Sequence, residues 1–239
     1  DHAMDIARMA ALDAGWSLDA PGVTLNRFCG SGQQAVMFAA QGVLSGFQDI
    51  VVAGGIESMS RPAPLHVDGF TANNDHLFAQ YPMVAQGISA DLIASVEGFS
   101  REECDRIAFD SQNRAAAALA EGRFDRSLVT IKSDDGTVAL DHEEFPRPGT
   151  TMDSLGKLTP SFEAMGSKPF KNGLTIDQTA LLTYPQVKEL RHVHHAGNSS
   201  GVVDGASALL VVSSDYAKAH GLKPRAKITM TAVAGTDPV

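Results

Sequence analysis

The spacing of apolar residues alternates between a helical and a strand-like pattern along the first 60 residues. Helical spacing covers residues 6–14 and 33–44, and each run stops near a glycine. Short apolar runs at residues 23–28 and 49–53 predict strands. Because the order is strand, glycine-containing turn, helix and strand, we predict an α/β layer fold for this segment.

The middle of the chain follows a different pattern. From Arg61 to about Leu92 the periodicity is weak, and prolines and glycines interrupt it. A helix is predicted next, because Ser100 and Glu103 have the spacing of a capping box and an alanine-rich stretch runs on to Ala120. Further along, residues 127–132 predict a strand, and residues 152–158 and 184–193 have helical potential.

The end of the chain returns to α/β patterning. Residues 208–212 and 226–234 predict strands on either side of a short helix at residues 214–220. We therefore expect an α/β core over residues 1–60, an inserted domain over residues 61–196 and a return to the core over residues 197–239. Inserted segments of this kind often carry substrate recognition on a catalytic scaffold.

The acidic net charge of the chain limits the kinds of ligand that it is expected to bind. The 239 residues include 28 acidic and 19 basic side chains, a formal net charge of −9. This argues against nucleic-acid binding, which needs a basic face, but leaves room for an anionic small ligand held by a few local Lys and Arg residues. No apolar run approaches the roughly 18 residues of a membrane span, and no signal peptide is visible. Both ends of the sequence look cut, so we expect a longer polypeptide.

Only two cysteines occur, Cys29 and Cys104. They form no disulfide framework and suit a reducing compartment, which we expect to be the cytoplasm, or an organellar matrix if a targeting segment is missing. Cys29 falls where a predicted strand ends and a helix begins, between Phe28 and Gly30. A helix N-terminus presents unpaired N–H groups that stabilise a thiolate and bind the oxyanion formed when it attacks a carbonyl. The alternative is a buried core cysteine, but the small residues after Cys29 permit an exposed turn.

Five segments, in order, resemble the motifs of the thiolase family. They are residues 26–36 (Asn-Arg-Phe-Cys-Gly-Ser-Gly-Gln-Gln-Ala-Val), 52–60 (Val-Ala-Gly-Gly-Ile-Glu-Ser-Met-Ser), 99–124, 147–158 (with Arg-Pro-Gly-Thr-Thr and Leu-Gly-Lys-Leu) and 196–206 (with Gly-Asn-Ser-Ser-Gly and Asp-Gly-Ala). The resemblance covers nearly the whole chain. It implies a thiolase-like layered αβαβα fold whose first half carries an inserted loop domain.

The resemblance also implies a chemistry. Thiolases pass acyl groups between coenzyme A and a cysteine, cleaving 3-ketoacyl-CoA or condensing two acyl-CoA molecules through a covalent intermediate. Coenzyme A and acyl-CoA are substrates in this reaction, and no tightly bound cofactor or metal is implied. The family assembles as homodimers or homotetramers, so we expect a homo-oligomer.

Residue roles carry over from the matching motifs. Cys29 is expected to be the nucleophile, and Ser200 the serine that contacts the pantetheine arm of CoA, with Gly201 beside it. Arg147 and Ser154 match loop-domain positions near the nucleotide end of CoA, and Met83 is a candidate to line the acyl pocket. The alternatives are a solvated loop arginine for Arg147, a turn serine for Ser200 and a core methionine for Met83.

Other family motifs do not occur in this sequence. The catalytic histidine of a Gly-His-Pro-x-Gly motif, the second cysteine of a Cys-x-Gly-Gly motif and the asparagine of an Asn-Glu-Ala-Phe motif are all missing. Cys104 is not the second cysteine, because no glycine pair follows it, and we expect it to pack on one face of a helix. We therefore expect the isolated 239-residue chain to be inactive, or to be part of a larger polypeptide.

The segment from residue 166 to 195 is longer than the link usual in the family and contains His192, His194 and His195. Without a fourth ligand these histidines are expected to be solvent-exposed or packing residues rather than a metal site. The residues around Met83 also lack a histidine that some thiolases have there, which favours the degradative class over the acetoacetyl-CoA thiolases.

Three other functions remain in competition. A ketoacyl synthase-like condensing enzyme also places a cysteine at a strand–helix turn, but the motifs at residues 147–151 and 197–201 favour thiolase. A non-catalytic thiolase-like protein that binds CoA or lipid, or assembles with a partner, would not need an intact Cys29. A papain-like cysteine hydrolase needs a histidine partner and leaves the other four segments unexplained.

Overall fold

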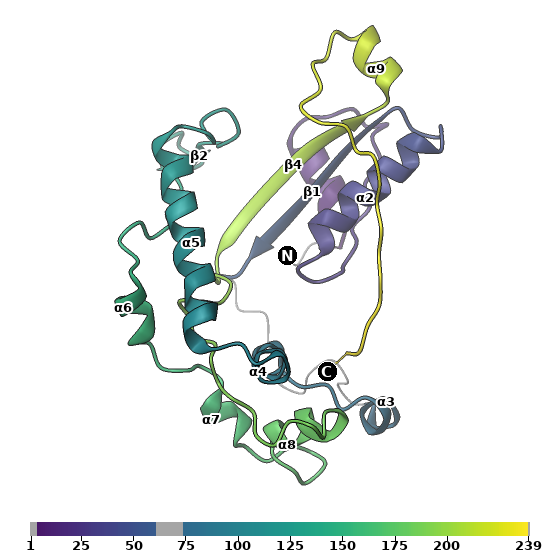
Figure 1. Cartoon of the computed structure of the whole chain (residues 1–239). Helices are drawn as coiled ribbons and strands as arrows, with labels where there is room; N and C mark the ends of the chain where they lie inside the picture. The colour runs from purple at the N-terminus through teal and green to yellow at the C-terminus, as the bar shows by residue number, and fades with distance from the viewer. Residues whose placement is uncertain (1–3, 61–73, 239) are drawn as a thin grey trace. The chain divides into compact units, whose positions relative to one another are not determined.

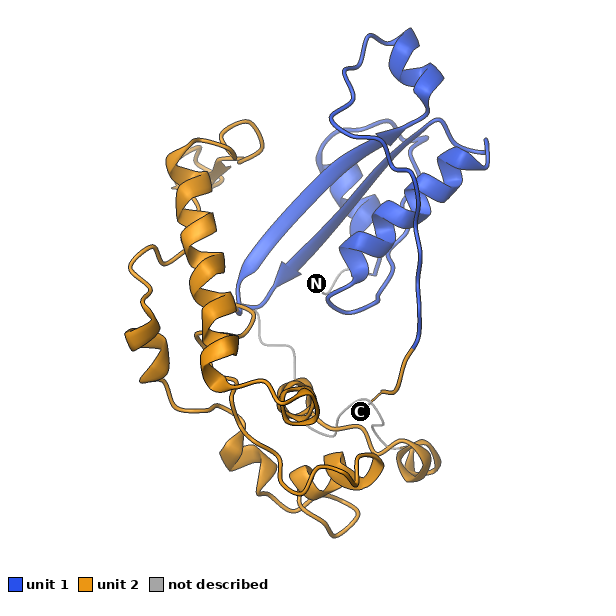
Figure 2. Ribbon diagram, viewed as in Figure 1, with its two compact units in different colours: residues 1–63, 202–235 blue, residues 64–201, 236–239 orange. Residues whose placement is uncertain are grey.

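The computed structural model describes residues 4–60 and 74–238, and the chain forms two compact units. Unit 1 comprises residues 1–63 and 202–235, and unit 2 comprises residues 64–201 and 236–239 (Figure 2). Helices and strands both occur, in an α/β arrangement. Among the described residues, no helix is long and apolar enough to cross a membrane.

Unit 1 is built on a pair of antiparallel strands. The strands β1 (Ile50–Ser58) and β4 (Asp204–Val212) run in register from Ile50 opposite Val212 to Ser58 opposite Asp204. Helix α2 (Ser31–Leu44) lies along this pair (Figure 1). The remaining helices of the unit are α1 (Ile6–Asp13) and α9 (Ser214–Ala219).

Two glycines in β1 lie next to other elements of unit 1. A Cβ atom on Gly54 would lie 2.6 Å from the carbonyl oxygen of Ser207 on β4. A Cβ atom on Gly55 would lie 3.6 Å from Cα of Gly32, in the first turn of α2. Only Gly54 is required by close packing, since the Cβ atom on Gly55 would make an ordinary van der Waals contact with the first turn of α2.

Unit 2 is mostly helical. Its helices are α3 (Asp75–Gln80), α4 (Gln86–Glu97), α5 (Arg101–Ala120), α6 (Met152–Gly156), α7 (Glu163–Gly166), α8 (Ile176–Ala180) and the 3-10 turn η1 (Leu181–Thr183), with a hairpin of β2 (Ile131–Lys132) and β3 (Val138–Leu140). The core contains Val84, Ile88, Leu92, Ala180 and Leu190. α4 and α8 pack together around this core, because their apolar side chains face one another.

Several predicted elements are confirmed. The helix at α5 begins with the capping box expected of Ser100 and Glu103, since the Ser100 hydroxyl accepts from the Glu103 N–H and the Glu103 carboxylate accepts from the Ser100 N–H. It ends before Gly122, whose φ of +64° is one that glycine adopts readily. The helices at α1, α2, α6 and α9 and the strands at β1 and β4 also lie where the pattern places them.

Two predicted strands are wrong. Residues 23–28 form only an isolated bridge between Arg27 and Cys29, and residues 226–234 have no regular secondary structure. A strand needs a neighbour that accepts its hydrogen bonds, and in the described part of unit 1 only β1 and β4 pair. The alternating side chains of the second segment are exposed instead, with Met230 84% exposed. The strand predicted at residues 127–132 shrinks to β2, because the N–H groups of Ser127 and Leu128 donate to the carbonyl of Phe124 in a turn.

Two helix predictions also need correction. α3 and α4 lie in the region where weak periodicity predicted little structure, although residues 61–73 of that region lie outside the described residues. Residues 184–193, which have helical potential, form no helix, and the 3-10 turn η1 ends just before them at Thr183. Their end is extended because the N–H group of Val193 donates to the carboxylate of Asp91 instead of to a carbonyl one turn earlier.

Candidate functional site

Cys29 is exposed and directly precedes Gly30, the N-cap residue of α2. Phe28, before it, has a φ of +48° and is the one non-glycine residue with positive φ in the described ranges 4–60 and 74–238. This backbone conformation costs a non-glycine residue about 1–3 kcal/mol, so it persists only where the surroundings hold it. We therefore expect specific contacts to hold the turn in this conformation.

Side chains on both sides of the turn hold it in place. The amide oxygen of Asn26 accepts from the N–H of Phe28 at 2.9 Å. The hydroxyl of Ser31 accepts from the N–H of Arg27 at 2.7 Å and donates to the carbonyl of Phe28 at 2.6 Å. Asn26 and Ser31 thus fix the backbone on either side of Cys29, which explains physically why these residue types flank the cysteine.

The first turn of α2 adds electrostatic support. Its N–H groups point toward the end of the helix at which Cys29 lies, and a helix of 14 residues carries a partial positive charge there. A Cβ atom built on Gly32 would meet no atom within 4 Å, so the surface of this turn is open. An exposed thiol on a strained turn at a helix N-terminus is the arrangement of a candidate nucleophile site. The N–H groups of Gly30 and Ser31 donate to the carbonyls of Arg27 and Phe28, so any free donors lie further into the first turn.

A depression of about 290 Å³ lies next to this turn in unit 1. Arg27, Gly30, Gln33, Gln34 and Met37 of the turn and α2 line it together with residues 232–234. The guanidinium of Arg27 donates to the amide oxygen of Gln34 at 2.5 Å and so closes one side.

A second depression, of about 320 Å³, lies within unit 2 and contains two of the predicted CoA residues. Arg147 and Ser154 both line it, together with Leu158, Gly197 and Ser199 among others. Gly201 adjoins it, since a Cβ atom there would collide with the ring of Phe145, which also lines it. Ser200 is exposed but is not among the lining residues, and Met83 is half-buried between α3 and α4, so their predicted roles stay predictions.

Arg147 has its backbone fixed and its side chain at the surface. Its N–H donates to the side-chain oxygen of Gln112 at 2.7 Å, and its carbonyl accepts from the hydroxyl of Thr150 at 2.8 Å. Its guanidinium lies 5.6 Å from the ring centroid of Phe145. An arginine beside an aromatic ring offers both a charge for phosphate and a flat surface for stacking.

The hydroxyl of Ser154 takes part in the capping box at the start of α6. In α6 its hydroxyl donates to the carbonyl of Thr151 at 2.8 Å and accepts from the N–H of Thr151 at 3.0 Å. One lone pair of the hydroxyl is left, so a ligand can reach Ser154 only as a hydrogen-bond donor.

Sequence reasoning missed two buried carboxylates that organise the segment around the histidines. Asp91 in α4 is fully buried and accepts from the N–H groups of Val193 and His194, and its oxygens lie 2.8 Å from Nδ1 of His192 and 2.7 Å from Nδ1 of His194. Asp105 in α5 is 2% exposed and binds His195, which is 1% exposed. The histidines are therefore largely buried and paired with carboxylates, so of the two expected alternatives they are packing residues and not solvent-exposed ones.

The pairing shifts the ionisation of two of these groups. Burial works to raise the pKa of Asp91, but hydrogen bonds from His194, Val193 and His192 outweigh it and hold the pKa below its usual range. Burial works to lower the pKa of His192, but hydrogen bonds to Asp91 and to Asp177, whose Oδ2 lies 3.1 Å from Nε2, raise it. An acidic residue inside the apolar stretch of α4 was the signal in the sequence, since a buried Asp needs a partner.

Cys104 lies half-buried in α5. Burial raises the pKa of its thiol, and the neighbouring Asp105 raises it further. It thus disfavours a thiolate, which agrees with the prediction of a packed helix cysteine. In the part of the chain that the structure describes, no group of three or more His, Cys, Asp or Glu side chains has a metal-binding arrangement.

Comparison with known proteins gives one family. The family model described as "Thiolase, N-terminal domain" matches residues 1–169. The chain is 36% identical over 241 residues to a 3-ketoacyl-CoA thiolase of Pseudoalteromonas translucida, covering 100% of this chain and 55% of that protein. It is 36% identical over 249 residues to an acetyl-CoA acetyltransferase of Cupriavidus necator, covering 97% of this chain and 56% of that protein. The chain thus spans about half the length of the curated relatives it matches.

Proposed function

Because this chain belongs to the thiolase family, we propose that it takes part in acyl transfer between coenzyme A and an enzyme cysteine, with Cys29 as the acyl acceptor. The observation that carries the proposal is the position of Cys29, exposed on a strained turn at the N-terminus of α2. Relatives named 3-ketoacyl-CoA thiolase and acetyl-CoA acetyltransferase support the substrate class, an acyl thioester of CoA.

The proposed first step is attack of the Cys29 thiolate on a carbonyl carbon of the substrate. This is the 3-keto carbonyl of a 3-ketoacyl-CoA in the cleavage direction and the thioester carbonyl of acetyl-CoA in the synthetic direction. A bond forms between Sγ and the carbonyl carbon, and the electron pair of the carbonyl moves to its oxygen. N–H groups in the first turn of α2, beyond those of Gly30 and Ser31 that donate to Arg27 and Phe28, are proposed to stabilise this oxyanion. In the cleavage direction, collapse of the oxyanion breaks the bond between C2 and C3, and acetyl-CoA leaves as a carbanion that takes up a proton. In the synthetic direction, the bond to the CoA sulfur breaks, and CoA leaves as a thiolate that takes up a proton. An acyl-Cys29 remains in both cases.

The proposed second step returns the acyl group to a second substrate. In the cleavage direction, the sulfur of free CoA attacks the acyl-Cys29 and releases a shortened acyl-CoA. In the synthetic direction, the carbanion of acetyl-CoA attacks instead and forms a 3-ketoacyl-CoA. Both directions need a base and an acid, and the family motifs that supply them do not occur in this sequence. We expect the degradative direction, because the residues around Met83 include no histidine.

The second depression, in unit 2, is the proposed site for CoA. Arg147 beside Phe145 suits a nucleotide, because the guanidinium pairs with phosphate and the ring offers a stacking surface for adenine. Ser154 is proposed to accept a hydrogen bond from a ligand donor there, because its own proton is already donated to the carbonyl of Thr151. Ser200 and Gly201 are proposed to contact the pantetheine arm, and Met83 to line the acyl pocket.

The surface of the strand pair in unit 1 supports an assembly. Val52, Ile56, Leu209 and Leu210 on β1 and β4 are all about half exposed, with values of 42% to 58%. A strand pair with apolar side chains in solvent is usual where another segment or chain covers it. We therefore propose the layered αβαβα arrangement of thiolases and a homodimer or homotetramer.

The experiment that tests the proposal is peptide mapping by mass spectrometry after the full-length gene product is incubated with acetyl-CoA. We expect one acetyl group on the peptide that contains Cys29, and we expect added CoA to remove it. A folded protein that binds CoA but is never acylated would refute acyl transfer and favour a non-catalytic CoA-binding role.

A further inference from the structure

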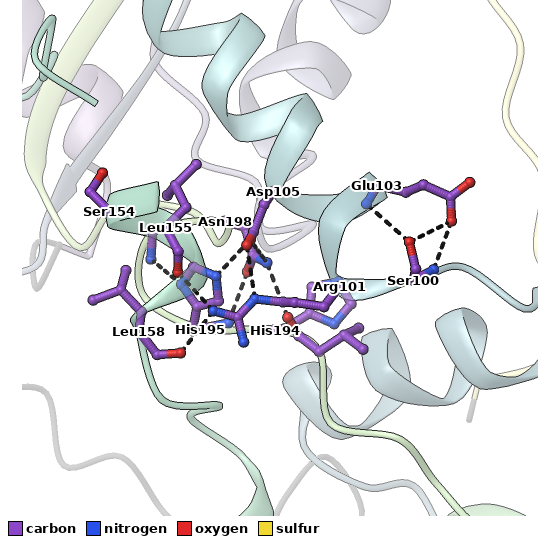
Figure 3. A network of polar contacts seen from close by, with 12 residues as sticks. Ser100, Arg101, Glu103, Asp105, Ser154, Leu155, Leu158, His194, His195 and Asn198 are labelled. Atoms are coloured by element: carbon purple, nitrogen blue, oxygen red, sulfur yellow. Dashed lines mark hydrogen bonds and ion pairs between the residues drawn. The ribbon is translucent and has the colours of Figure 1, made fainter. Parts of the chain in front are cut away.

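Helix α5 places three polar residues on one face, all of which connect to the depression in unit 2. Arg101, Asp105 and Gln112 are spaced by four and seven residues, which brings them onto the same side of the helix. Gln112 lines the depression and accepts from the N–H of Arg147. Arg101 and Asp105 lie nearer the N-terminus of the helix, and a network of hydrogen bonds connects them to the residues that line the depression (Figure 3).

One branch of the network starts at Asp105 and holds the loop that ends the inserted segment. Its Oδ1 lies 2.7 Å from Nε2 of His195 and accepts from the amide nitrogen of Asn198 at 2.9 Å. The N–H of Gly197 donates to Nδ1 of His195 at 3.0 Å, so the ring proton lies on Nε2 and points at Asp105. The Asn198 amide in turn accepts from the N–H of His195. This loop forms one wall of the depression, through Gly197 and its neighbours.

The other branch starts at Arg101 and holds the opposite wall. Its Nε donates to Oδ2 of Asp105 at 3.0 Å, and its Nη2 donates to the carbonyls of Leu155 (2.8 Å) and Leu158 (2.7 Å). Leu155 and Leu158 line the depression beside Ser154. The Arg101 side chain therefore joins the Asp105 carboxylate to the end of α6, as Figure 3 shows.

We infer that the Arg101–Asp105 pair is a positioning element that sets the distance between the two walls of this depression, and with it the affinity for CoA. Neither side chain is among the residues that line the depression, so both act through the backbone of residues 155–158 and 195–198. Solvent has little access to the centre of the network, since Asp105 and His195 are almost completely buried. A buried network in which each donor has an acceptor holds its members in one geometry. The inference rests on the proposed function for the identity of the ligand.

The test is the dissociation constant for CoA, measured by calorimetry on the full-length gene product and its variants. Arg101→Met removes all three hydrogen bonds and keeps an unbranched apolar stem, and Arg114→Met changes an exposed arginine of the same helix as the matched control. We expect Arg101→Met to weaken CoA binding on the order of tenfold or more, because buried acceptors lose their donors. We expect Arg114→Met to stay within about twofold, as surface substitutions usually do.

A second pair of variants tests the Asp105 branch. His195→Leu removes the donor to Asp105, whereas His195→Gln offers an amide N–H at the place of Nε2 and should recover part of the affinity. Ile88→Val controls for loss of stability, because it loosens the core of unit 2 without touching the depression. If it weakens CoA binding as much as Arg101→Met at an equal fall in melting temperature, the positioning role is wrong.

Two further readouts separate this inference from the proposed function. Acetylation of Cys29 by S-acetyl-N-acetylcysteamine, a thioester without a nucleotide, should proceed at the same rate in Arg101→Met as in the unsubstituted protein. Amide hydrogen exchange in residues 154–158 and 195–199 should accelerate in Arg101→Met even without CoA. Unchanged exchange and unchanged CoA affinity in folded Arg101→Met would overturn the inference. Failure of the unsubstituted protein to bind CoA or to accept an acetyl group would overturn the proposed function instead.

Discussion

Replacing Asp91 with alanine removes one carboxylate from the interior of unit 2 and with it four hydrogen-bond acceptor contacts. The carboxylate is fully buried and serves the N–H groups of Val193 and His194 and the Nδ1 atoms of His192 and His194. In Asp91→Ala the N–H of Val193 stays buried without a partner, which costs about 1–3 kcal/mol for one donor. The Nδ1 atoms of His192 and His194 lose their hydrogen-bond partner as well.

The total loss follows from these parts. An unsatisfied buried donor costs about 1–3 kcal/mol, and Asp91→Ala removes the acceptor of several donors at once, so we expect it to lower the free energy of unfolding by about 3–5 kcal/mol. This is a large fraction of the roughly 5–15 kcal/mol that stabilises a typical domain. Asp91→Asn keeps one oxygen for the backbone N–H groups, and we expect a smaller loss of about 1–2 kcal/mol.

The assay is urea unfolding followed by circular dichroism, together with amide hydrogen exchange at residues 193 and 194. We expect protected amides in the unsubstituted protein and Asp91→Asn, and fast exchange at both positions in Asp91→Ala. A free energy of unfolding in Asp91→Ala within about 0.5 kcal/mol of the unsubstituted value, the range of ordinary surface changes, would refute the reasoning.

Two other predictions concern pH and packing. The pKa of His192 is raised in the folded state, so protonation of this histidine stabilises the fold. This stabilisation is fully present below the usual histidine pKa of 6.5 and is lost as the pH rises through the folded-state pKa. Unfolding at a series of pH values should therefore show a fall in stability above pH 6.5 that His192→Gln lacks, and an equal fall in both proteins would contradict the assignment. Gly54→Val places a Cβ atom 2.6 Å from the carbonyl oxygen of Ser207, so we expect the free energy of unfolding to fall by about 1–3 kcal/mol, measured by thermal unfolding. An unchanged melting temperature would contradict the close packing of β1 against β4.

The sequence predicts local structure well where local signals suffice. The capping box at Ser100 and the glycine after α5 define a helix without any knowledge of its neighbours. The turn at Cys29 is similar, because Asn26 and Ser31 make their hydrogen bonds within a few residues. The small residues beside Cys29 and the family motif that they resemble likewise make it the candidate nucleophile from sequence alone.

Pairings between distant residues could not be predicted in this way. Asp105 and His195 are 90 residues apart, and nothing in either segment specifies the other. The predicted strand at residues 226–234 failed for a related reason, since alternation describes side chains but not the partner that a strand needs. Arg147 and Ser154 lie in one depression, and their role in CoA binding stays a prediction. The capping role of Ser154 follows only from its hydrogen bonds to Thr151.

Acetylation of Cys29 by acetyl-CoA in the full-length gene product tests the central claim most directly. Peptide mapping by mass spectrometry should find one acetyl group on the peptide that contains Cys29, lost on addition of CoA and never formed in Cys29→Ala. Cys104, whose thiol pKa is raised by burial, should stay unmodified and serves as the internal control. A folded protein that binds CoA yet shows no acetyl group on Cys29, or carries it on Cys104 instead, would contradict the account.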